Sequence, residues 1–249
     1  MARHFVSVLF LLLLSTQAHA GWYHVENYEG AVGPDSIHLS LQTYDGFGSG
    51  ITVQGSYFYD AKRSPVALYG KTTDGKLELC AIANDEEFYR IIVMGSKTPF
   101  DTSRCPLSQT LDDNGATGSW RKDGQMQPVS LKKVATLDDT GEAQISGTVE
   151  IPFWAQTATH MFSGLYASAD TGICMQTLQI IDKNSNKVDQ QIDFDNNDCN
   201  AGMLMTPIYM NVERQADGDM ILVNIRDGQA GDSMDYSFNP ATRRYDPAK

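Results

Sequence analysis

Apolar and polar residues alternate along this chain with a period of two, most regularly in residues 55–80. Side chains alternate between the two faces of a β-strand, so Tyr57 and Tyr59 share one face of a first predicted strand. Asp74-Gly75 is typical of a two-residue hairpin turn, because such turns need positive φ at both central positions. Leu77 and Leu79 resume the alternation. The stretch therefore predicts three short strands joined by two turns.

Similar short segments, separated by turn residues, recur along the rest of the chain. Further strands are predicted at residues 36–41, 51–59, 88–94, 129–134, 143–154, 161–169, 175–182, 188–194, 203–212, 220–226 and 234–238. No window of eleven or more residues shows a helical period of apolar positions. The pattern indicates an all-β protein whose antiparallel sheets form two sandwich or barrel-like units. A polar, acidic break at 138–142 separates predicted domains at 21–137 and 143–249.

The first twenty residues predict a secretory signal peptide. Arg3 and His4 precede an apolar run at residues 5–14, and Ala18-His19-Ala20 has the small residues of a cleavage site. The apolar run is too short to span a membrane, so membrane insertion is not expected. No cysteine follows the cleavage site after Ala20, so a lipoprotein anchor is not expected either. We therefore expect a soluble protein of the periplasm.

The charge balance narrows the choice of partners. The chain has 19 Lys and Arg against 31 Asp and Glu, which gives a formal net charge of −12. Such a chain repels the phosphates of nucleic acids and the surfaces of anionic membranes. A basic protein partner would instead be attracted electrostatically. The alternative is that the acidity only keeps an exported protein soluble.

The chain contains four cysteines, at positions 80, 105, 174 and 199. An even number in an exported protein indicates disulfides, and four cysteines allow three pairings. The pairs Cys80–Cys105 and Cys174–Cys199 are favoured, because each would close a local loop within one half of the chain. A loop of this size stabilises a fold by about 3 kcal/mol in the chain-entropy description.

Catalytic and zinc-binding motifs are weak in this sequence. His24, His38 and His160 are far apart and form no zinc-binding pattern, and no GxSxG motif marks a nucleophilic serine. We therefore expect no enzyme, although a triad or a carboxylate pair that meets only in space stays open as an alternative.

Two acidic segments resemble parts of calcium-binding loops. Asp193 and Asp195 alternate as oxygen ligands do, and Asp217-Gly218-Asp219 has the glycine of such a loop. The first segment lacks the glycine and the terminal glutamate, and the second lacks a continuous ligand series. We therefore expect no cofactor, with calcium at these aspartates as the weaker alternative.

The segment Ser163-Gly164-Leu165-Tyr166 is the short pattern that most suggests a binding site. A Ser-Gly turn lets the backbone approach a partner closely, and tyrosine is enriched at binding hot spots. The alternative is that Phe162, Gly164 and Tyr166 form one face of a strand.

Two sets of segments resemble known bacterial families. The first resembles a β-rich module of small envelope proteins, with GxYxY, DGxLxL and G-x-W segments at Gly55, Tyr57, Tyr59, Asp74, Gly75, Leu77, Leu79, Gly118 and Trp120. The second, at residues 175–183, 188–192 and 236–245, resembles periplasmic immunity proteins. Those proteins neutralise peptidoglycan hydrolases that antibacterial secretion systems deliver. The calcium loop common in that family is degraded here at residues 211–219.

The Ser163–Tyr166 pattern is also similar to the SGxY loop of periplasmic lysozyme inhibitors. The resemblance implies a loop that inserts into the active site of a basic cell-wall hydrolase, through Ser163, Gly164 and Tyr166, with Trp154 and His160 beside them. Inhibition of such a hydrolase is the first functional hypothesis. A β-barrel that binds a small molecule or glycan in an aromatic-lined pocket is the second, and an envelope hydrolase is the third.

Overall fold

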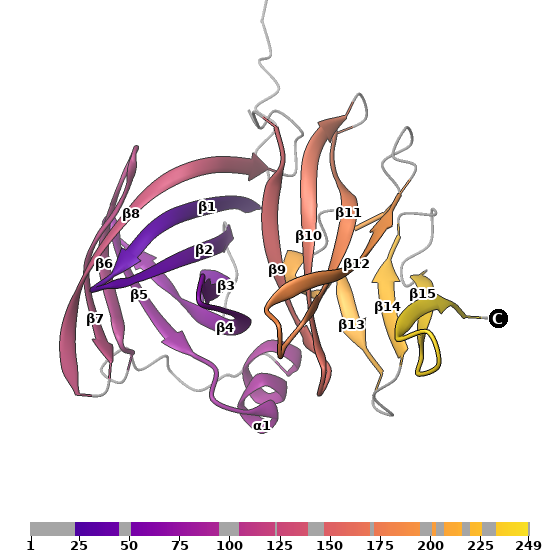
Figure 1. Ribbon diagram of the computed structural model, residues 1–249. Coiled ribbons are helices and arrows are strands. Elements are labelled where there is room, and N and C mark those ends of the chain that lie inside the picture. The colour runs from indigo at the N-terminus through magenta and orange to yellow at the C-terminus, as the bar shows by residue number, and fades with distance from the viewer. Residues whose placement is uncertain are drawn as a thin grey trace, which may run out of the picture.

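Antiparallel strands dominate the fold, which confirms the all-β prediction. The computed structural model describes residues 23–44, 51–94, 105–122, 124–138, 147–169, 172–194, 201–202, 207–215, 220–225 and 233–248. Within them the chain forms a closed barrel and two four-stranded sheets (Figure 1). The predicted signal peptide lies outside the described residues.

Eight strands form the barrel, and each pairs with its neighbours in the sequence. They are β1 Tyr23–Val32, β2 Asp35–Tyr44, β3 Val53–Tyr59, β4 Lys62–Thr73, β5 Lys76–Ala81, β6 Leu107–Asp112, β7 Gly115–Lys122 and β8 Gln125–Asp138. Antiparallel pairing of β8 with β1 closes the barrel, so these strands leave no free edge. At the predicted turn, Asp74 and Gly75 have φ of 51° and 73°.

The barrel interior is filled by the inward side chains of the alternating strands. Leu39, Tyr57, Leu68, Leu79 and Trp120 are among the residues that pack there. A polar group lies beside them, since Glu26 accepts hydrogen bonds from Lys133 Nζ and Tyr28 Oη, both at 2.7 Å. Burial raises the pKa of the Glu26 carboxyl, but these hydrogen bonds outweigh burial and hold it below its ordinary value.

The second half of the chain forms two sheets. The first has the order β12-β11-β10-β9 and contains β9 Val149–Gln156, β10 His160–Ala169, β11 Gly172–Asp182 and β12 Lys187–Asp193. The second runs in chain order through β13 Val212–Arg214, β14 Met220–Asn224, β15 Ser233–Asn239 and β16 Arg244–Pro247. Both sheets bury apolar side chains in one shared core.

The same core continues onto the outer face of the barrel. Tyr23, Val25 and Leu137 of the barrel are buried against the residues of the sheets. Polar contacts cross the same junction, because Gln42 Oε1 accepts from the backbone N–H of Ile208 at 2.8 Å. The change from barrel to sheets falls between β8 and β9, but one core holds both parts together (Figure 1).

The prediction of a strand at 88–94 is wrong, and so is the part of the 203–212 prediction that covers residues 208–210, while residues 203–206 lie outside the described ranges. Helix α1 spans Asp85–Phe88, η1 continues as a π-helical turn over Tyr89–Val93, and η3 is a 3₁₀ turn over Ile208–Met210. The Asn84 side chain caps α1 by accepting from the N–H of Glu87 at 2.9 Å. Glu87 in turn accepts at 2.8 Å from the N–H of Ala83, the residue before the cap, which ties the entering chain to the first turn of the helix. No helix in the described ranges is both long and apolar enough to cross a membrane.

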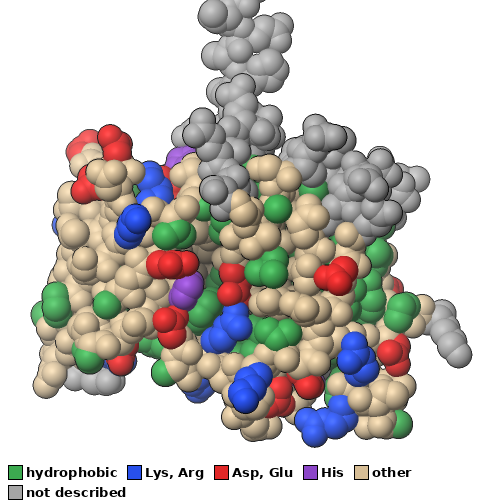
Figure 2. Space-filling model, turned by 45° about the horizontal axis from the view of Figure 1, so that its top comes forward, with side chains coloured by type: hydrophobic (Ala, Val, Ile, Leu, Met, Phe, Trp, Pro, Cys, Tyr) green, Lys and Arg blue, Asp and Glu red, His purple; other side chains and the backbone are tan. Residues whose placement is uncertain are grey.

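The first predicted disulfide is confirmed. Cys80 at the end of β5 bonds to Cys105, which precedes β6, and the two are 25 positions apart. In the second predicted pair, Cys174–Cys199, Cys199 lies outside the described residues. The surface around this framework mixes acidic and basic side chains, as one face of the molecule shows (Figure 2).

Replacing Cys80 and Cys105 together by serine should lower the free energy of unfolding by about 3 kcal/mol, because the loop between β5 and β6 is no longer closed. Urea unfolding without reductant measures this change. A loss well under about 1 kcal/mol would show that strand pairing alone determines the stability of this loop.

The lowered pKa of the Glu26 carboxyl predicts that the free energy of unfolding depends on pH. A carboxyl whose pKa is lower in the folded state stabilises the fold above its unfolded pKa, about 4.3, and loses that contribution as the pH falls through the folded value. Glu26→Gln should therefore flatten the fall of unfolding free energy below about pH 4. Glu78→Gln is a control, since Glu78 makes only a 3.9 Å ion pair with Lys76. Equal acid dependence in both variants would contradict the assignment.

Candidate functional site

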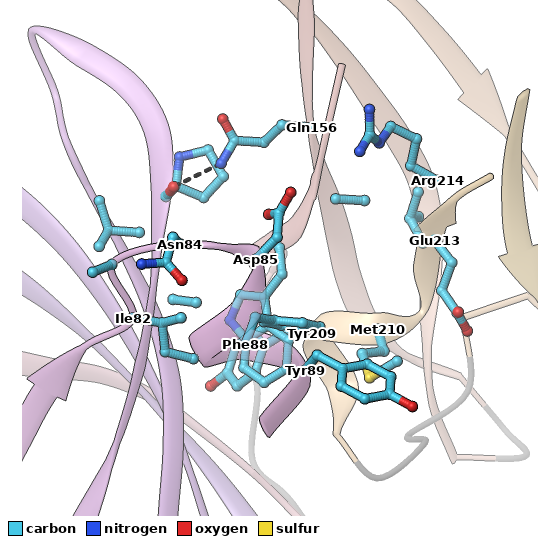
Figure 3. A pocket seen from close by; sticks show the side chains of 17 residues that line it. Ile82, Asn84, Asp85, Phe88, Tyr89, Gln156, Tyr209, Met210, Glu213 and Arg214 are labelled. Carbon is cyan, nitrogen blue, oxygen red and sulfur yellow. Dashed lines mark hydrogen bonds between the residues drawn. The ribbon is translucent and has the colours of Figure 1, made fainter. Parts of the chain in front are cut away.

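A cleft lies where the barrel meets the sheets, and we call it the junction cleft. Its volume is about 580 Å³. The barrel contributes residues of β4, the β5–α1 connection and the α1–η1 segment, and the second half contributes residues of β9, η3 and β13 (Figure 3). The lining segments are residues 65–67, 82–85, 88–89, 154–156, 209–210 and 212–214.

Aromatic rings from both halves meet in the junction cleft. Trp154 stacks on Tyr209 with ring centroids 5.2 Å apart, and Phe88 meets the indole edge-on at 5.3 Å. The Trp154 Nε1–H donates to the carbonyl of Gly55 at 2.9 Å, which fixes the indole against the barrel. Tyr89 lies beside these rings and is 57% exposed. The cleft thus offers a rigid aromatic surface with one open ring at its edge.

Polar side chains surround these aromatic rings. Asp85 projects into the cleft from the start of α1, and Glu213 and Arg214 project from β13 on the other wall (Figure 3). Gln156 Nε2 donates to the carbonyl of Pro65 at 2.8 Å, so this amide also joins the two walls. Hydrogen-bonding groups around an apolar surface are typical of ligand pockets.

Buried tyrosines stiffen the base of the cleft. Tyr209 Oη and Ser40 Oγ share a hydrogen bond of 3.0 Å across the junction. Burial raises the pKa of the Tyr209 hydroxyl, and the bond with Ser40 offsets only part of that rise. The phenol therefore stays neutral and serves as a structural hydrogen-bonding group.

Of the predicted partner-binding residues, Trp154 lines this cleft and the other four lie in β10. Ser163 is 2% exposed, and its hydroxyl donates to Glu150 Oε1 at 2.6 Å. The same carboxylate accepts from Arg63 of the barrel. Ser163 therefore belongs to a polar bridge between β10, β9 and β4.

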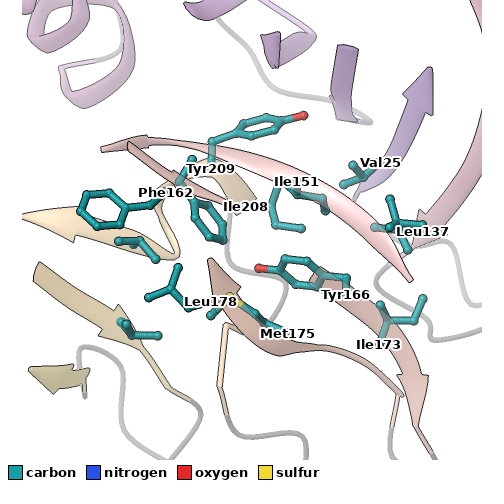
Figure 4. Packing of buried hydrophobic residues seen from close by; sticks show 14 of the residues in the cluster. Val25, Leu137, Ile151, Phe162, Tyr166, Ile173, Met175, Leu178, Ile208 and Tyr209 are labelled. Carbon is teal, nitrogen blue, oxygen red and sulfur yellow. The ribbon is translucent and has the colours of Figure 1, made fainter. Parts of the chain in front are cut away.

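Tyr166 belongs to the core of the second half (Figure 4), and Gly164 packs against that core. A Cβ at Gly164 would lie 2.7 Å from atoms of Phe153, Met175 and Tyr166, so no larger residue fits without displacement. Tyr166 is fully buried, and its hydroxyl accepts from Asn211 Nδ2 at 2.8 Å. Burial raises the pKa of this hydroxyl despite that hydrogen bond.

His160 is also buried, at 1% exposed. Its Nδ1 lies 2.9 Å from Thr159 Oγ1, and its Nε2 lies 3.5 Å from a carboxylate oxygen of Asp189. The ring contacts Phe238 and Tyr245 of the second sheet. His160 thus joins the two sheets and does not present its ring to solvent.

The expectation of a protruding loop at residues 163–166 is therefore wrong. This segment lies in the middle of β10, between β9 and β11, and a strand paired on both edges cannot insert into a partner. The alternative is confirmed, because Phe162, Gly164 and Tyr166 pair with Ile180, Leu178 and Met175, and these residues face the core.

Metal ligands do not cluster in the described part of the chain. No group of three or more His, Cys, Asp or Glu side chains there is arranged to hold a metal ion. Asp193, at the end of β12, accepts from Thr177 Oγ1 at 2.9 Å. Asp195, Asp217 and Asp219 lie outside the described residues.

The sequence pattern did not indicate the cleft residues on α1, because residues 88–94 suggested a strand. The overlooked signal was Asn84-x-x-Glu87, a capping-box spacing followed by apolar residues.

Comparison of the chain with protein families, with curated proteins and with solved structures found no match. The resemblances to immunity proteins and lysozyme inhibitors therefore stay predictions.

Tyr166→Phe should lower the free energy of unfolding by about 1–2 kcal/mol, because the buried Asn211 amide loses an acceptor. Urea unfolding at neutral pH measures the change. Tyr89→Phe is the matched control, since an exposed hydroxyl contributes about 0.5 kcal/mol or less. Equal stability of Tyr166→Phe and the unsubstituted protein would contradict this structural role.

Proposed function

We propose that this chain is an exported binding protein whose junction cleft takes a short glycan. The observation that carries the proposal is the aromatic surface of Trp154, Phe88 and Tyr89 within a cleft of about 580 Å³. Pocket volumes of about 300–1,000 Å³ are usual for small ligands. The proposal follows the second of the three functional hypotheses.

The chemistry of the cleft suits a sugar. One face of a pyranose ring carries C–H groups that pack on an aromatic ring, while its hydroxyl groups need hydrogen-bond donors and acceptors around the edge. The cleft supplies aromatic rings at its base, and carboxylates, amides and a guanidinium at its walls, from Asp85, Asn84, Gln156, Glu213 and Arg214. Residues from both halves would therefore contact the same ligand.

The shape of the site also separates this proposal from hydrolase inhibition. An inhibitor that occludes an enzyme cleft needs a protruding element, whereas the junction cleft is concave. Ser163 and Tyr166, the expected contacts, are buried in β10. The net charge of −12 still favours a basic protein partner, so inhibition through another surface stays a second candidate.

Tyr89→Ala should weaken glycan binding about 5- to 30-fold, the range for loss of an aromatic hot spot worth about 1–2 kcal/mol. The probes are cellotetraose, tetra-N-acetylchitotetraose and maltotetraose, measured by titration calorimetry. Because Tyr89 is 57% exposed, the melting temperature should change little.

Met126→Ala is the matched control, since Met126 is also 57% exposed but lies on β8 and does not line the cleft. Absence of binding by all three sugars, or equal binding by Tyr89→Ala and Met126→Ala, would overturn the proposal. Inhibition of a lysozyme-type hydrolase that survives Tyr89→Ala would favour the inhibitor candidate instead.

A further inference from the structure

Three basic side chains lie near one another at the junction cleft, and of these only Arg214 belongs to its lining. Arg214 lines the cleft, and in Figure 3 it lies on the same side of the cleft as Gln156. Lys183 Nζ donates to the carbonyl of Thr157, the residue after Gln156, at 2.7 Å. This bond holds the ammonium group next to the Gln156 end of the cleft. Lys62 is the third member.

Contact between two hairpins brings Lys62 to this place. Lys62 is the first residue of β4, directly after the β3–β4 turn. The N–H of Arg63 donates to Asn186 Oδ1 at 2.9 Å, and Asn186 Nδ2 donates to the carbonyl of Asp60 at 3.1 Å. Asn186 lies in the β11–β12 turn, which begins next to Lys183. Contact between the two hairpins therefore brings Lys62 near Lys183.

These cations lack carboxylate partners within the described residues. The ion pairs found there, within 4.0 Å, include none of Lys62, Lys183 and Arg214. Burial first, and then repulsion by Lys62 and Arg214, lower the pKa of Lys183. In a chain of net charge −12, three neighbouring cations with no carboxylate within 4.0 Å in the described ranges are an unusual arrangement. Their mutual repulsion would be relieved by an anion between them.

We propose that Arg214, Lys183 and Lys62 bind a single anionic group, a carboxylate, at one end of the glycan held in the junction cleft. This rests on the proposed function and specifies its ligand as an acidic sugar. The planar guanidinium of Arg214 matches a carboxylate with two parallel hydrogen bonds. Lys183 has three N–H donors, and its bond to Thr157 uses only one of them.

The remaining charges of the cleft limit the ligand to few anionic groups. Asp85 and Glu213 line the same cleft, and they repel carboxylates placed along its length. At physiological ionic strength, exposed charges more than about 8 Å apart are largely screened, so the local cluster outweighs the net charge of the chain. A uronic-acid unit at one end fits this distribution better than a polyanion.

The test compares neutral disaccharides with counterparts that differ only in one terminal uronate. Cellobiose, N,N′-diacetylchitobiose and maltose are titrated against their C6-oxidised forms by calorimetry. In at least one series the uronate should bind about tenfold more tightly than the neutral sugar, as expected for a charged hydrogen-bonded pair. Raising the salt concentration should reduce this preference.

Arg214→Gln should remove most of the uronate preference, measured as the ratio of uronate affinity to neutral-sugar affinity in the same variant. Lys62→Gln should reduce the preference by a smaller factor, because Lys62 does not line the cleft. Arg121→Gln is the matched control, since Arg121 is an exposed arginine on β7 that does not line the cleft. Cellobiose 6′-phosphate is titrated in the same way, to show whether a phosphate is accepted as well as a carboxylate.

The outcomes separate this inference from the proposed function. Neutral sugars that bind as tightly as their uronates overturn the acidic-sugar inference and leave glycan binding supported. A phosphate sugar that binds more tightly than every uronate also overturns the choice of carboxylate. Failure of every sugar to bind, neutral or acidic, overturns both. Equal uronate affinity of Arg214→Gln and Arg121→Gln would show that Arg214 and its neighbouring lysines do not bind the carboxylate.

Discussion

Burial of the outer face of the barrel against the two sheets is the constraint on which this structure depends. Tyr23, Val25 and Leu137 point away from the barrel interior and would be exposed if the barrel stood alone. The sheets cover them with the same apolar core that holds the two sheets together. Polar contacts such as that between Gln42 and Ile208 then fix the relative orientation of the parts, because a buried amide without a partner is costly. The barrel has its own interior core, but its outer face is buried only by the second half.

The junction cleft is a product of the same contact. A closed barrel and a pair of sheets are both convex, so a recess forms beside the area where they touch. The hydrogen bonds of Trp154 and Gln156 to backbone carbonyls of the barrel keep the two walls at a constant distance. The capped start of α1 adds Asp85 and Phe88 to one wall. A rigid recess of this kind costs little to organise when a ligand binds.

Local features of the sequence predicted much of the fold and little of the site. Alternation of apolar residues, the Asp74-Gly75 turn and the Cys80–Cys105 pair all act over short distances and can be recognised without the structure. Closure of the barrel by β1 and β8 joins residues 97 to 114 positions apart, and no local pattern encodes that pairing. The Ser163–Tyr166 segment suggested a protruding loop for a related reason. The same four-residue sequence can occur in a loop or in a central strand. Only its pairing with β9 and β11 on both sides shows that it is part of a strand here.

The wide separation of the cleft residues along the chain has a consequence for when the site can act. Its walls join residues 65–67 and 82–89 to residues 154–156 and 209–214, so no fragment made early in synthesis contains them all. The site exists only after nearly the whole chain has folded. Occupancy of the cleft would therefore report that both halves of the chain have folded and packed together.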